Sequence, residues 1–567
     1  MYTKHYNVRK TLQSTAIPGR SDMVKNNAGG FGFSVDDWER LNRFLIMGSC
    51  GGTFYVEEKK LTLDNADAVL RCIAEDGGRV IATATRVSVD GRAPKNEPAI
   101  FVLALCVKFG DAATKRCALV YMKDVCRIGT HLFTFAQYLK DLNVGWGRGV
   151  RNAFASWYNT KTPSSAAYQV LKYQGRVVIE KDNSSRWTHA DILRLAHPTP
   201  STQAHSDVFK WAIKGWKDDD DIGSVDLAQI YAYEAIKTAS TEDHVLGLIQ
   251  DYNLTREMVP TKWLNSVRVW EVLLARMPLN AMVRNLGKMT SMGLVKTFSN
   301  AAMQVGKRLH DQEYIKKSRL HPLGVLVAMM TYAQGYGNRG DLSWDPVGSV
   351  VDSLNDAFYL AFGNVVPTGK RTMLCLDLSG SMQHPIAGMP ISARAGSAAM
   401  ALVTKAVEPN CMVCGFTMQG KDAISFSGQS AEGLALGVSE LPISQRQRLD
   451  DVVRSIENTW GCGGNGWNST YRFTGTDCSL PMRYATKRKI PVDAFVVYTD
   501  SETWAGNMHP TQALDEFRQV MGIDAKLVVV GMVSNSHTVA DPTDPKQLDV
   551  VGFDTSTPNA ISEFIRG

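Results

Sequence analysis

The sequence predicts a chain of two parts, a long helical region followed by a doubly wound, Rossmann-like α/β domain. Residues 21–367 form a series of helical hairpins, with apolar residues at i, i+3, i+4 and i+7 in segments such as 131–142. From residue 368 apolar runs alternate with helical segments, which indicates a parallel sheet with helices on both faces. A chain of 567 residues is also too long for one ordinary core, so more than one domain is expected.

In the α/β part, each apolar run of four to eight residues is predicted to be a buried strand. The predicted strands are 371–378, 411–417, 492–500 and 525–533, and the predicted helices are 392–407, 449–459, 509–521 and 559–567. The first of these helices is rich in alanine, which lets it pack closely on a sheet. Asp450 and Asp451 favour the start of the second, because acidic side chains stabilise a helix N-terminus.

In the helical part, the clearest amphipathic segments are 111–128, 131–142, 267–277, 279–289 and 356–365. Pro278 separates two of them, because proline cannot continue a helix. The pattern is typical of stacked helix pairs, as in α-solenoids. The sequence shows no repeat of fixed length, so any repeats are degenerate.

Composition indicates a folded protein without a membrane span. Hydrophobic residues make up 44% and charged residues 21% of the chain, and no apolar stretch reaches the roughly 18 residues that a span requires. Residues 1–20 are polar and basic and lack an apolar signal core, so we expect an N-terminal arm. The ten cysteines are scattered through predicted helices and strands, as reduced thiols usually are, so we expect a cytoplasmic protein.

The basic charge of the chain lies in the helical part. The formal net charge is +6, but the residues from Thr368 onward include 17 Lys and Arg against 20 Asp and Glu, a net charge of −3. The first 367 residues therefore carry +9. This excess favours a polyanionic partner for the helical part. A solvated basic surface is the alternative, because +9 is modest for that length.

The segment RTMLCLDLSGSM at 371–382 predicts a metal site. Its apolar run ends in Asp377, and Ser379 and Ser381 flank Gly380, which allows a sharp turn after the strand. The three side chains would meet at the carboxyl edge of the sheet, where open α/β folds bind ligands. Hard oxygen donors of this kind suit Mg²⁺ or another hard divalent cation. The alternative is a simple helix cap, which Ser and Asp often form.

This segment resembles the metal-ion-dependent adhesion site of von Willebrand factor A domains, whose signature is Asp-x-Ser-x-Ser. The resemblance implies two further ligands, a Thr and an Asp later in the chain. Thr476 in FTGTDCSLPM and Asp500 at the end of VDAFVVYTD match them, and Asp477 competes with Thr476 for its role. In related A domains such a metal takes a carboxylate from a protein partner.

The helical part is similar to the TROVE module of the Ro 60-kDa autoantigen family, in which an A domain follows directly. The resemblance lies in segments 43–61 (RFLIMGSCGGTFYVEEKKL), 145–158, 170–176, 186–200, 260–290 and 319–337. It implies a TROVE domain over 21–367, built as a ring of HEAT-like helical repeats, and an A domain over 368–567 that closes the ring. It also implies binding of Y-like small RNA on the outer surface and of single-stranded 3′ ends of misfolded RNA in the central hole, with no DNA or membrane partner.

Phosphate binding requires Lys and Arg side chains that share one face. Three pairs have a suitable spacing: Arg148 with Arg151, Arg284 with Lys288, and Lys172 with Arg176. Each pair is equally compatible with a solvated helix face. The family resemblance assigns Lys172, Arg176 and His197 to contacts with Y RNA. Residues 177–186 are longer than the family's short turn, so we expect a different outer surface there.

Three functions remain open from the sequence. The first is a non-catalytic RNA-binding ring for RNA quality control or small-RNA stability, with a protein partner such as a ribonuclease at the metal site. The second is a metal-dependent adhesion scaffold without an RNA role. The third, a metal enzyme, is disfavoured because the five ligands include only two acids and no GxSxG elbow surrounds Ser379 or Ser381.

Overall fold

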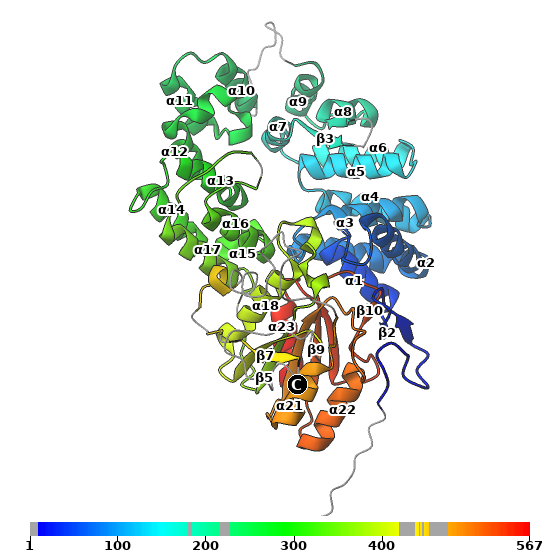
Figure 1. Cartoon of the computed structure of the whole chain (residues 1–567). Coiled ribbons are helices and arrows are strands. Elements are labelled where there is room, and N and C mark those ends of the chain that lie inside the picture. Colours follow the sequence, from blue (N-terminus) through cyan, green and yellow to red (C-terminus); the bar gives the residue numbers. More distant parts are fainter. Residues whose placement is uncertain are drawn as a thin grey trace, which may run out of the picture.

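The computed structural model describes residues 10–50, 52–179, 184–215, 227–338, 340–363, 365–418, 437–441, 443–444, 447–452 and 475–567. For residues 175–179 and 184–186 it describes the backbone alone. Helices follow one another through the first part of the chain, and a sheet flanked by helices forms the second part (Figure 1).

The helical part begins with a run of helices, each of which packs on a neighbouring helix in the chain or on the one beyond that neighbour. They are α1 (Asp37–Met47), α2 (Glu58–Asp90), α3 (Glu97–Phe109), α4 (Ala112–Val125), α5 (Gly129–Asp141), α6 (Arg148–Asn159), α7 (Pro163–Lys172), α8 (His189–Ala196) and α9 (Gln203–Lys214). A hairpin of β3 (Gly175–Ile179) and β4 (Ser184–Thr188) lies between α7 and α8, at the insertion noted in the sequence.

A second arc of helices follows. It consists of α10 (Ala228–Thr238), α11 (Glu242–Tyr252), η2 (Arg256–Met258), η3 (Thr261–Asn265), α12 (Val267–Arg276), α13 (Leu279–Ser291), α14 (Asn300–Leu309), α15 (Gln312–Ser318), α16 (Pro322–Gln334) and α17 (Gly348–Leu360). Four of the five periodic segments therefore form helices close to their predicted limits. The fifth, predicted over 356–365, overlaps only the end of α17, which begins at Gly348 and ends at Leu360. Residues 267–277 and 279–289 become α12 and α13, which are separated at Pro278 as expected.

The two arcs meet at two seams and form a ring (Figure 1). At the first seam α7 packs on α10, and the Gln174 amide donates to the Tyr233 hydroxyl. At the second seam Arg319 Nε donates to the Val89 carbonyl at 2.7 Å. At the same seam, the imidazole of His321 donates from Nε2 to the Arg92 carbonyl at 3.1 Å. The ring is thus closed by contacts between residues far apart in sequence.

The second part is a six-stranded sheet in the order β11-β9-β8-β5-β6-β7. Its strands are β5 (Thr372–Asp377), β6 (Cys411–Phe416), β7 (Val438–Glu440), β8 (Ala494–Thr499), β9 (Lys526–Gly531) and β11 (Gln547–Val551). All pair in parallel except β7, which runs antiparallel to β6 at one edge. The four predicted strands are confirmed, whereas the sequence pattern missed β7 and β11.

Helices cover both faces of this sheet. They are α18 (Ala393–Val407) and α23 (Thr557–Arg566) on one face and α21 (Leu480–Arg488) and α22 (Pro510–Met521) on the other. Alternate residues of β5 enter two cores: Leu374 and Leu376 join the core shared with the ring helices, and Met373 and Cys375 join the core under α21 and α22. Most of the predicted helix at 449–459 lies outside the described residues.

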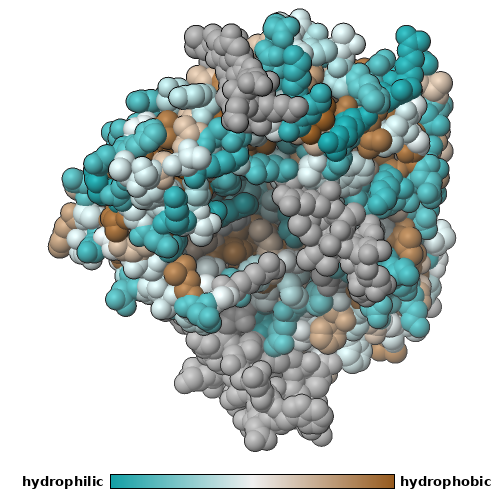
Figure 2. All heavy atoms as spheres, turned by 90° about the horizontal axis from the view of Figure 1, so that it is seen from above, coloured by the Kyte–Doolittle hydropathy of each residue, from teal (hydrophilic) through white to brown (hydrophobic). Residues whose placement is uncertain are grey.

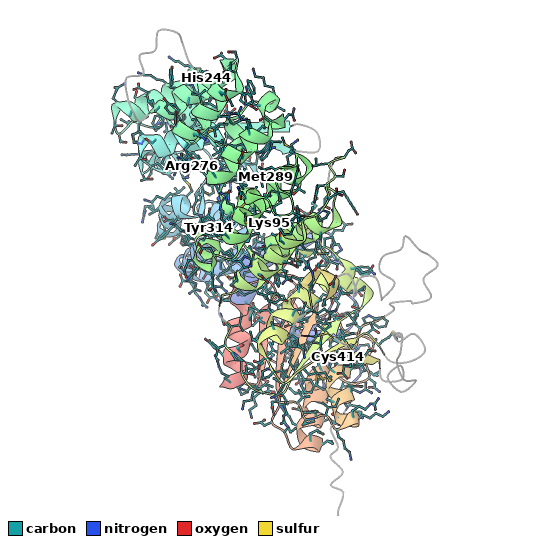
Figure 3. All side chains as sticks on the ribbon, turned by 90° about the vertical axis from the view of Figure 1, so that its left-hand side faces the viewer. Lys95, His244, Arg276, Met289, Tyr314 and Cys414 are labelled. Atoms are coloured by element: carbon teal, nitrogen blue, oxygen red, sulfur yellow. The ribbon has the colours of Figure 1, made fainter. Side chains whose placement is uncertain are left out.

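The two parts are joined by ion pairs and by the N-terminal segment. Arg43 of α1 pairs with Asp549 of β11, and Arg92 pairs with Asp554. Lys95 of the ring, labelled in Figure 3 above Cys414 of the sheet, donates to the Ala387 carbonyl. The strands β1 (Met23–Lys25) and β2 (Phe31–Ser34) form a small sheet with β10 (His537–Thr538) of the second domain.

Residues 10–34 therefore pack on the A domain, although the sequence divides them between an arm and the helical domain. Within the described part of the chain, no helix has both the length and the apolar character that a membrane span needs.

Candidate functional site

The predicted metal site lies at the carboxyl edge of the sheet, where β5 ends. Asp377 is the last residue of β5 and is fully buried. Its carboxylate accepts hydrogen bonds from Ser379 N at 3.0 Å and from Thr499 Oγ1, at the end of neighbouring β8, at 2.6 Å. Burial raises the pKa of Asp377 above its ordinary value. This carboxylate is therefore fixed in position by two strand ends.

The two serines follow in a tight turn. The hydroxyls of Ser379 and Ser381 are 3.1 Å apart, and both side chains are buried. Arg394, buried in α18, donates to the carbonyls of Leu378 and Ser379 at 3.0 and 2.8 Å. Its guanidinium therefore holds the turn through the backbone, and the serine hydroxyls remain directed toward each other.

Asp500 follows β8 and joins the same cluster. The side chain is buried, and Ser381 is hydrogen-bonded to its carboxylate. Burial raises the pKa of Asp500 well above its usual value, and the negative charges of Asp377 and Glu502 add to this effect. Glu502 belongs to this site but was not predicted from the sequence. Its position two residues after the predicted ligand Asp500 could have indicated it.

Thr476 lies in the loop that borders this cluster and is buried. Its carbonyl accepts from the backbone N–H groups of Trp504 and Ala505, both at 3.0 Å. The carboxylate of neighbouring Asp477 is engaged by Gln13 Nε2 at 2.7 Å and by the N–H and hydroxyl of Ser479 at 3.0 and 2.6 Å. This engagement favours Thr476 over Asp477 as the ligand from this loop.

The donor set fits a hard divalent cation. Two carboxylates and three hydroxyls from Asp377, Ser379, Ser381, Thr476 and Asp500 are all oxygen donors. The buried hydroxyls of Thr417 and Ser501, beside the ends of β6 and β8, have no hydrogen-bond partner among the described residues. The described residues contain no cluster of three or more His, Cys, Asp or Glu side chains arranged for a metal.

A bound cation would also resolve the electrostatics of this edge. Buried carboxylates with raised pKa values repel each other, and a divalent charge bound by them would offset that repulsion. The edge is therefore built to hold positive charge. The bound ion would supply an open coordination position for a further oxygen ligand.

The predicted RNA-binding residues lie apart from this edge, on the ring. Arg148 and Arg151 are exposed in the first turn of α6. Arg284 is exposed and Lys288 half-buried on α13. The structure keeps both of these pairs on one helix. It does not keep the third pair on one helix, because α7 ends at Lys172 and Arg176 lies in strand β3.

The residues assigned to Y RNA lie at element ends. Lys172 ends α7, and its ammonium donates to the Tyr168 hydroxyl at 2.9 Å. His197 is exposed at the C-cap of α8, with φ of 46°, and lines a pocket of about 300 Å³ with Lys210 and Lys214. The side chain of Arg176 lies outside the described part of the structure, and its backbone pairs with Trp187 in the hairpin.

Lys172 also lines a pocket that crosses the first seam of the ring. The pocket has a volume of about 320 Å³, and Arg256 and Arg276 of the second arc line it as well. Seen from above, most of the exposed side chains are hydrophilic, and apolar ones lie at the floor of a hollow (Figure 2). A hydrophilic surface suits a polar ligand more than an apolar one.

A ring of paired helices, joined to an A-type α/β domain with an oxygen-donor site at its sheet edge, defines a class of two-domain binding protein. The chain belongs to the Ro60 family. The TROVE domain model matches residues 24–243 and 250–330, and the Ro60 vWA domain model matches residues 371–565.

Relatives and a solved structure agree with this assignment. The RNA-binding protein RO60 of Caenorhabditis elegans is 32% identical, over 97% of this chain and 91% of the relative. The RNA-binding protein RO60 of Deinococcus radiodurans is 37% identical, over 96% of this chain and 95% of the relative. The crystal structure of the Deinococcus radiodurans Ro protein (RSR) superposes with a TM-score of 0.66 at 36% identity, covering 94% of this chain and 100% of that one.

Proposed function

We propose that this chain is an RNA-binding protein of the Ro type, which acts in RNA quality control or protects small RNAs. The support is that two relatives aligned over nearly the whole chain are RNA-binding proteins by name. The observation that carries the proposal is the division of charge along the chain, since residues 1–367, which include the ring, have a net charge of +9 and the residues from Thr368 onward −3. RNA phosphates favour the basic part, because binding there releases counterions.

The family resemblance adds two RNA surfaces to this proposal. Y-like small RNA binds the outer surface of the ring through Lys172, Arg176 and His197. Single-stranded 3′ ends of misfolded RNA bind within the ring, with Arg284 and Lys288 as phosphate contacts, and Arg148 and Arg151 add a further basic pair. The exposure of Arg148, Arg151, Arg284 and His197 supports this assignment, because phosphate contacts require accessible cations.

The A domain has a separate role in this proposal. Its oxygen-donor edge binds a divalent cation, most simply Mg²⁺, and through it the carboxylate of a protein partner such as a ribonuclease. The protein itself is not an enzyme, and it acts in the cytoplasm. The alternative is an adhesion scaffold without an RNA role. It uses the same metal site at the sheet edge but gives the basic helical part no function.

The proposal is tested by RNA binding under controlled salt. The purified protein is expected to carry small RNA, and its affinity for structured RNA should fall about 10³-fold or more between 50 and 200 mM salt if six or more phosphates are contacted. Gel-shift titrations at several salt concentrations measure this slope. A preparation that is free of nucleic acid and shifts no structured RNA at low salt would leave the adhesion scaffold as the better function.

A further inference from the structure

A loop of the helical domain reaches the metal edge of the A domain. This metal-edge loop, residues 48–57, connects α1 with α2. Ser534 Oγ of the A domain donates to the Gly48 carbonyl at 2.7 Å. Asn65 of α2 donates to the hydroxyls of both Ser49 and Ser534 at 3.3 Å. The loop is therefore anchored to both domains at its start.

A second close contact fixes the same part of the loop. A Cβ atom added at Gly388 would lie 2.5 Å from the Cys50 sulfur. Gly388 belongs to the segment that follows the two serines of the metal site. The A domain therefore has a glycine at a point where the loop packs tightly against it.

A tight turn at the tip of the loop presents two aromatic side chains. Thr53 N donates to the Val56 carbonyl at 2.8 Å, and Val56 N donates to Thr53 Oγ1 at 3.1 Å. Gly52 has φ of 66°, and a Cβ there would lie 2.5 Å from the Val56 carbonyl oxygen. Between these anchors Phe54 is 58% and Tyr55 37% exposed, with ring centroids 5.0 Å apart in a T-shaped contact.

Tyr55 reaches the predicted metal ligands themselves. Its hydroxyl is hydrogen-bonded to Ser381, and it lies near the carboxylates of Asp500, Glu502 and Asp377. A phenol carries its proton at neutral pH, so this hydroxyl can donate a hydrogen bond. Tyr55 is thus a neutral hydrogen-bond donor, contributed by the helical domain, at the mouth of an acidic site.

We propose that Tyr55 and Phe54 form, with the metal edge, the docking surface for a protein partner that presents a carboxylate side chain next to an apolar residue. This inference rests on the metal site described above and names how its partner is recognised. The Tyr55 hydroxyl donates to the partner's carboxylate, and the exposed Phe54 ring packs on the neighbouring apolar side chain.

The charges at the metal edge determine which partner side chain binds there and whether its binding requires the cation. The acidic side chains of Asp377, Asp500 and Glu502 lie together at this edge, so a partner carboxylate is accepted there through a bound cation. Tyr55 adds a hydrogen-bond donor without adding charge. This donor favours a partner carboxylate over a neutral side chain, because a hydrogen bond to a charged acceptor is stronger. Because the metal-edge loop belongs to the ring, partner docking contacts both domains.

The test uses the full chain with Mn²⁺, whose effect on water-proton relaxation reports both metal binding and displacement of its water by an oxygen ligand. Acetate is the first probe. Wild type and Tyr55→Phe are expected to bind Mn²⁺ with affinities within about threefold of each other. The acetate concentration for half-displacement should rise about tenfold or more in Tyr55→Phe, because a hydrogen bond to a charged acceptor is lost.

Two further variants and a second probe complete the experiment. Tyr231→Phe, at an exposed tyrosine of α10, is the matched control and should behave as wild type. N-acetyl-aspartyl-leucine amide should bind more tightly than acetate, and Phe54→Ala should reduce that advantage about fivefold through lost apolar contact. Circular dichroism melts confirm that each variant is folded.

The outcomes separate the two proposals. If wild type binds Mn²⁺ and acetate displaces water equally well in Tyr55→Phe, the docking role of Tyr55 is overturned while the metal site stands. If Mn²⁺ binds wild type no better than Asp377→Ala, the metal site itself fails and the docking surface fails with it.

Discussion

At the scale of single residues, Gln13 shows how a distant side chain orders the metal edge. It is fully buried, and its amide nitrogen donates to Asp477 Oδ1 and to the Met508 carbonyl, both at 2.7 Å. Its amide oxygen accepts from Thr503 Oγ1 at 2.5 Å. One amide thus ties the loop before α21 to the loop after β8. These loops carry the candidate ligands Thr476 and Asp500, so Gln13 helps to position both ligands without contacting the metal site itself.

Replacing Gln13 with alanine should destabilise the protein and weaken metal binding. The change removes one buried hydrogen bond from Asp477 and one from Thr503 and opens a cavity, so we expect the free energy of unfolding to fall by about 2–4 kcal/mol. Urea unfolding measures this loss, and calorimetric titration with Mn²⁺ measures the affinity. Gln203→Ala, at an exposed glutamine of α9, should change stability by less than about 0.5 kcal/mol. Unchanged unfolding in Gln13→Ala would contradict this role.

At the scale of secondary-structure elements, the seams of the ring depend on helix ends. His321 is the N-cap of α16, and its Nδ1 accepts from Leu323 N at 3.2 Å. Nε2 donates across the second seam to the Arg92 carbonyl. Both ring nitrogens are used by a neutral imidazole, and burial lowers the pKa of His321 to about 4. The helix cap at Leu323 N and the seam contact with Arg92 therefore both require the uncharged form of the His321 imidazole.

The second seam should weaken in mild acid. The unfolded chain binds a proton at His321 near the ordinary pKa of 6.5, whereas the folded chain binds it only near 4, so stability is full above 6.5 and falls as pH drops toward 4. The loss from this residue is about 1.4 kcal/mol per pH unit within that window. His321→Asn keeps a capping oxygen but cannot titrate. Urea unfolding between pH 7 and 5 should show a shallower decline in the variant; parallel declines would exclude this histidine as the cause.

Helix α13 offers a direct test of the ring's RNA surface. We expect Arg284→Ala with Lys288→Ala to weaken binding of a single-stranded 3′ end about tenfold at 0.1 M salt and to reduce the salt slope by about one to two. Folding should be unaffected, because Arg284 is exposed and Lys288 half-buried. Fluorescence anisotropy with a labelled single strand measures the affinity. The control is Lys487→Ala with Arg488→Ala on α21 of the A domain, which removes the same charge elsewhere. An equal loss of RNA affinity in this control would show that net charge, and not the position on α13, causes the change.

At the scale of the whole molecule, the two binding surfaces lie in separate domains with opposite net charge. The metal edge belongs to the A domain, and the basic pairs belong to the ring. The domains nevertheless share one continuous core and are joined by the Arg43–Asp549 and Arg92–Asp554 ion pairs. In the function proposed above, the ring would hold RNA while the metal edge holds a protein.

Asp377→Ala should therefore separate the two functions. Removal of this carboxylate eliminates a required oxygen donor, so binding of Mn²⁺ in calorimetric titrations should fall by at least a factor of 10. Affinity for RNA in gel shifts should stay within about twofold of wild type. Asp524→Ala, at an exposed position of the same domain, is the control for both assays. Loss of RNA binding in a folded Asp377→Ala protein would mean that the two surfaces are not independent.

Much of this architecture could be predicted from local patterns. The run that ends in Asp377 was predicted to be a strand and is β5, because a buried parallel strand requires consecutive apolar residues. The turn through Ser379 and Ser381 follows from the same segment. The antiparallel edge strand β7 could not be predicted in this way, because three residues give too short a pattern.

The sequence by itself determined the division into a helical part and an α/β part, and the set of oxygen donors at the strand ends, because each depends on residues close together in the chain. Only the tertiary structure decided what completes the metal edge. Gln13 lies 464 residues from Asp477, its hydrogen-bond partner. Tyr55 meets Ser381 across the domain boundary. Such contacts leave no periodicity or spacing in the sequence, since they arise when ring closure and shared core packing bring the N-terminal segment and the metal-edge loop against the sheet.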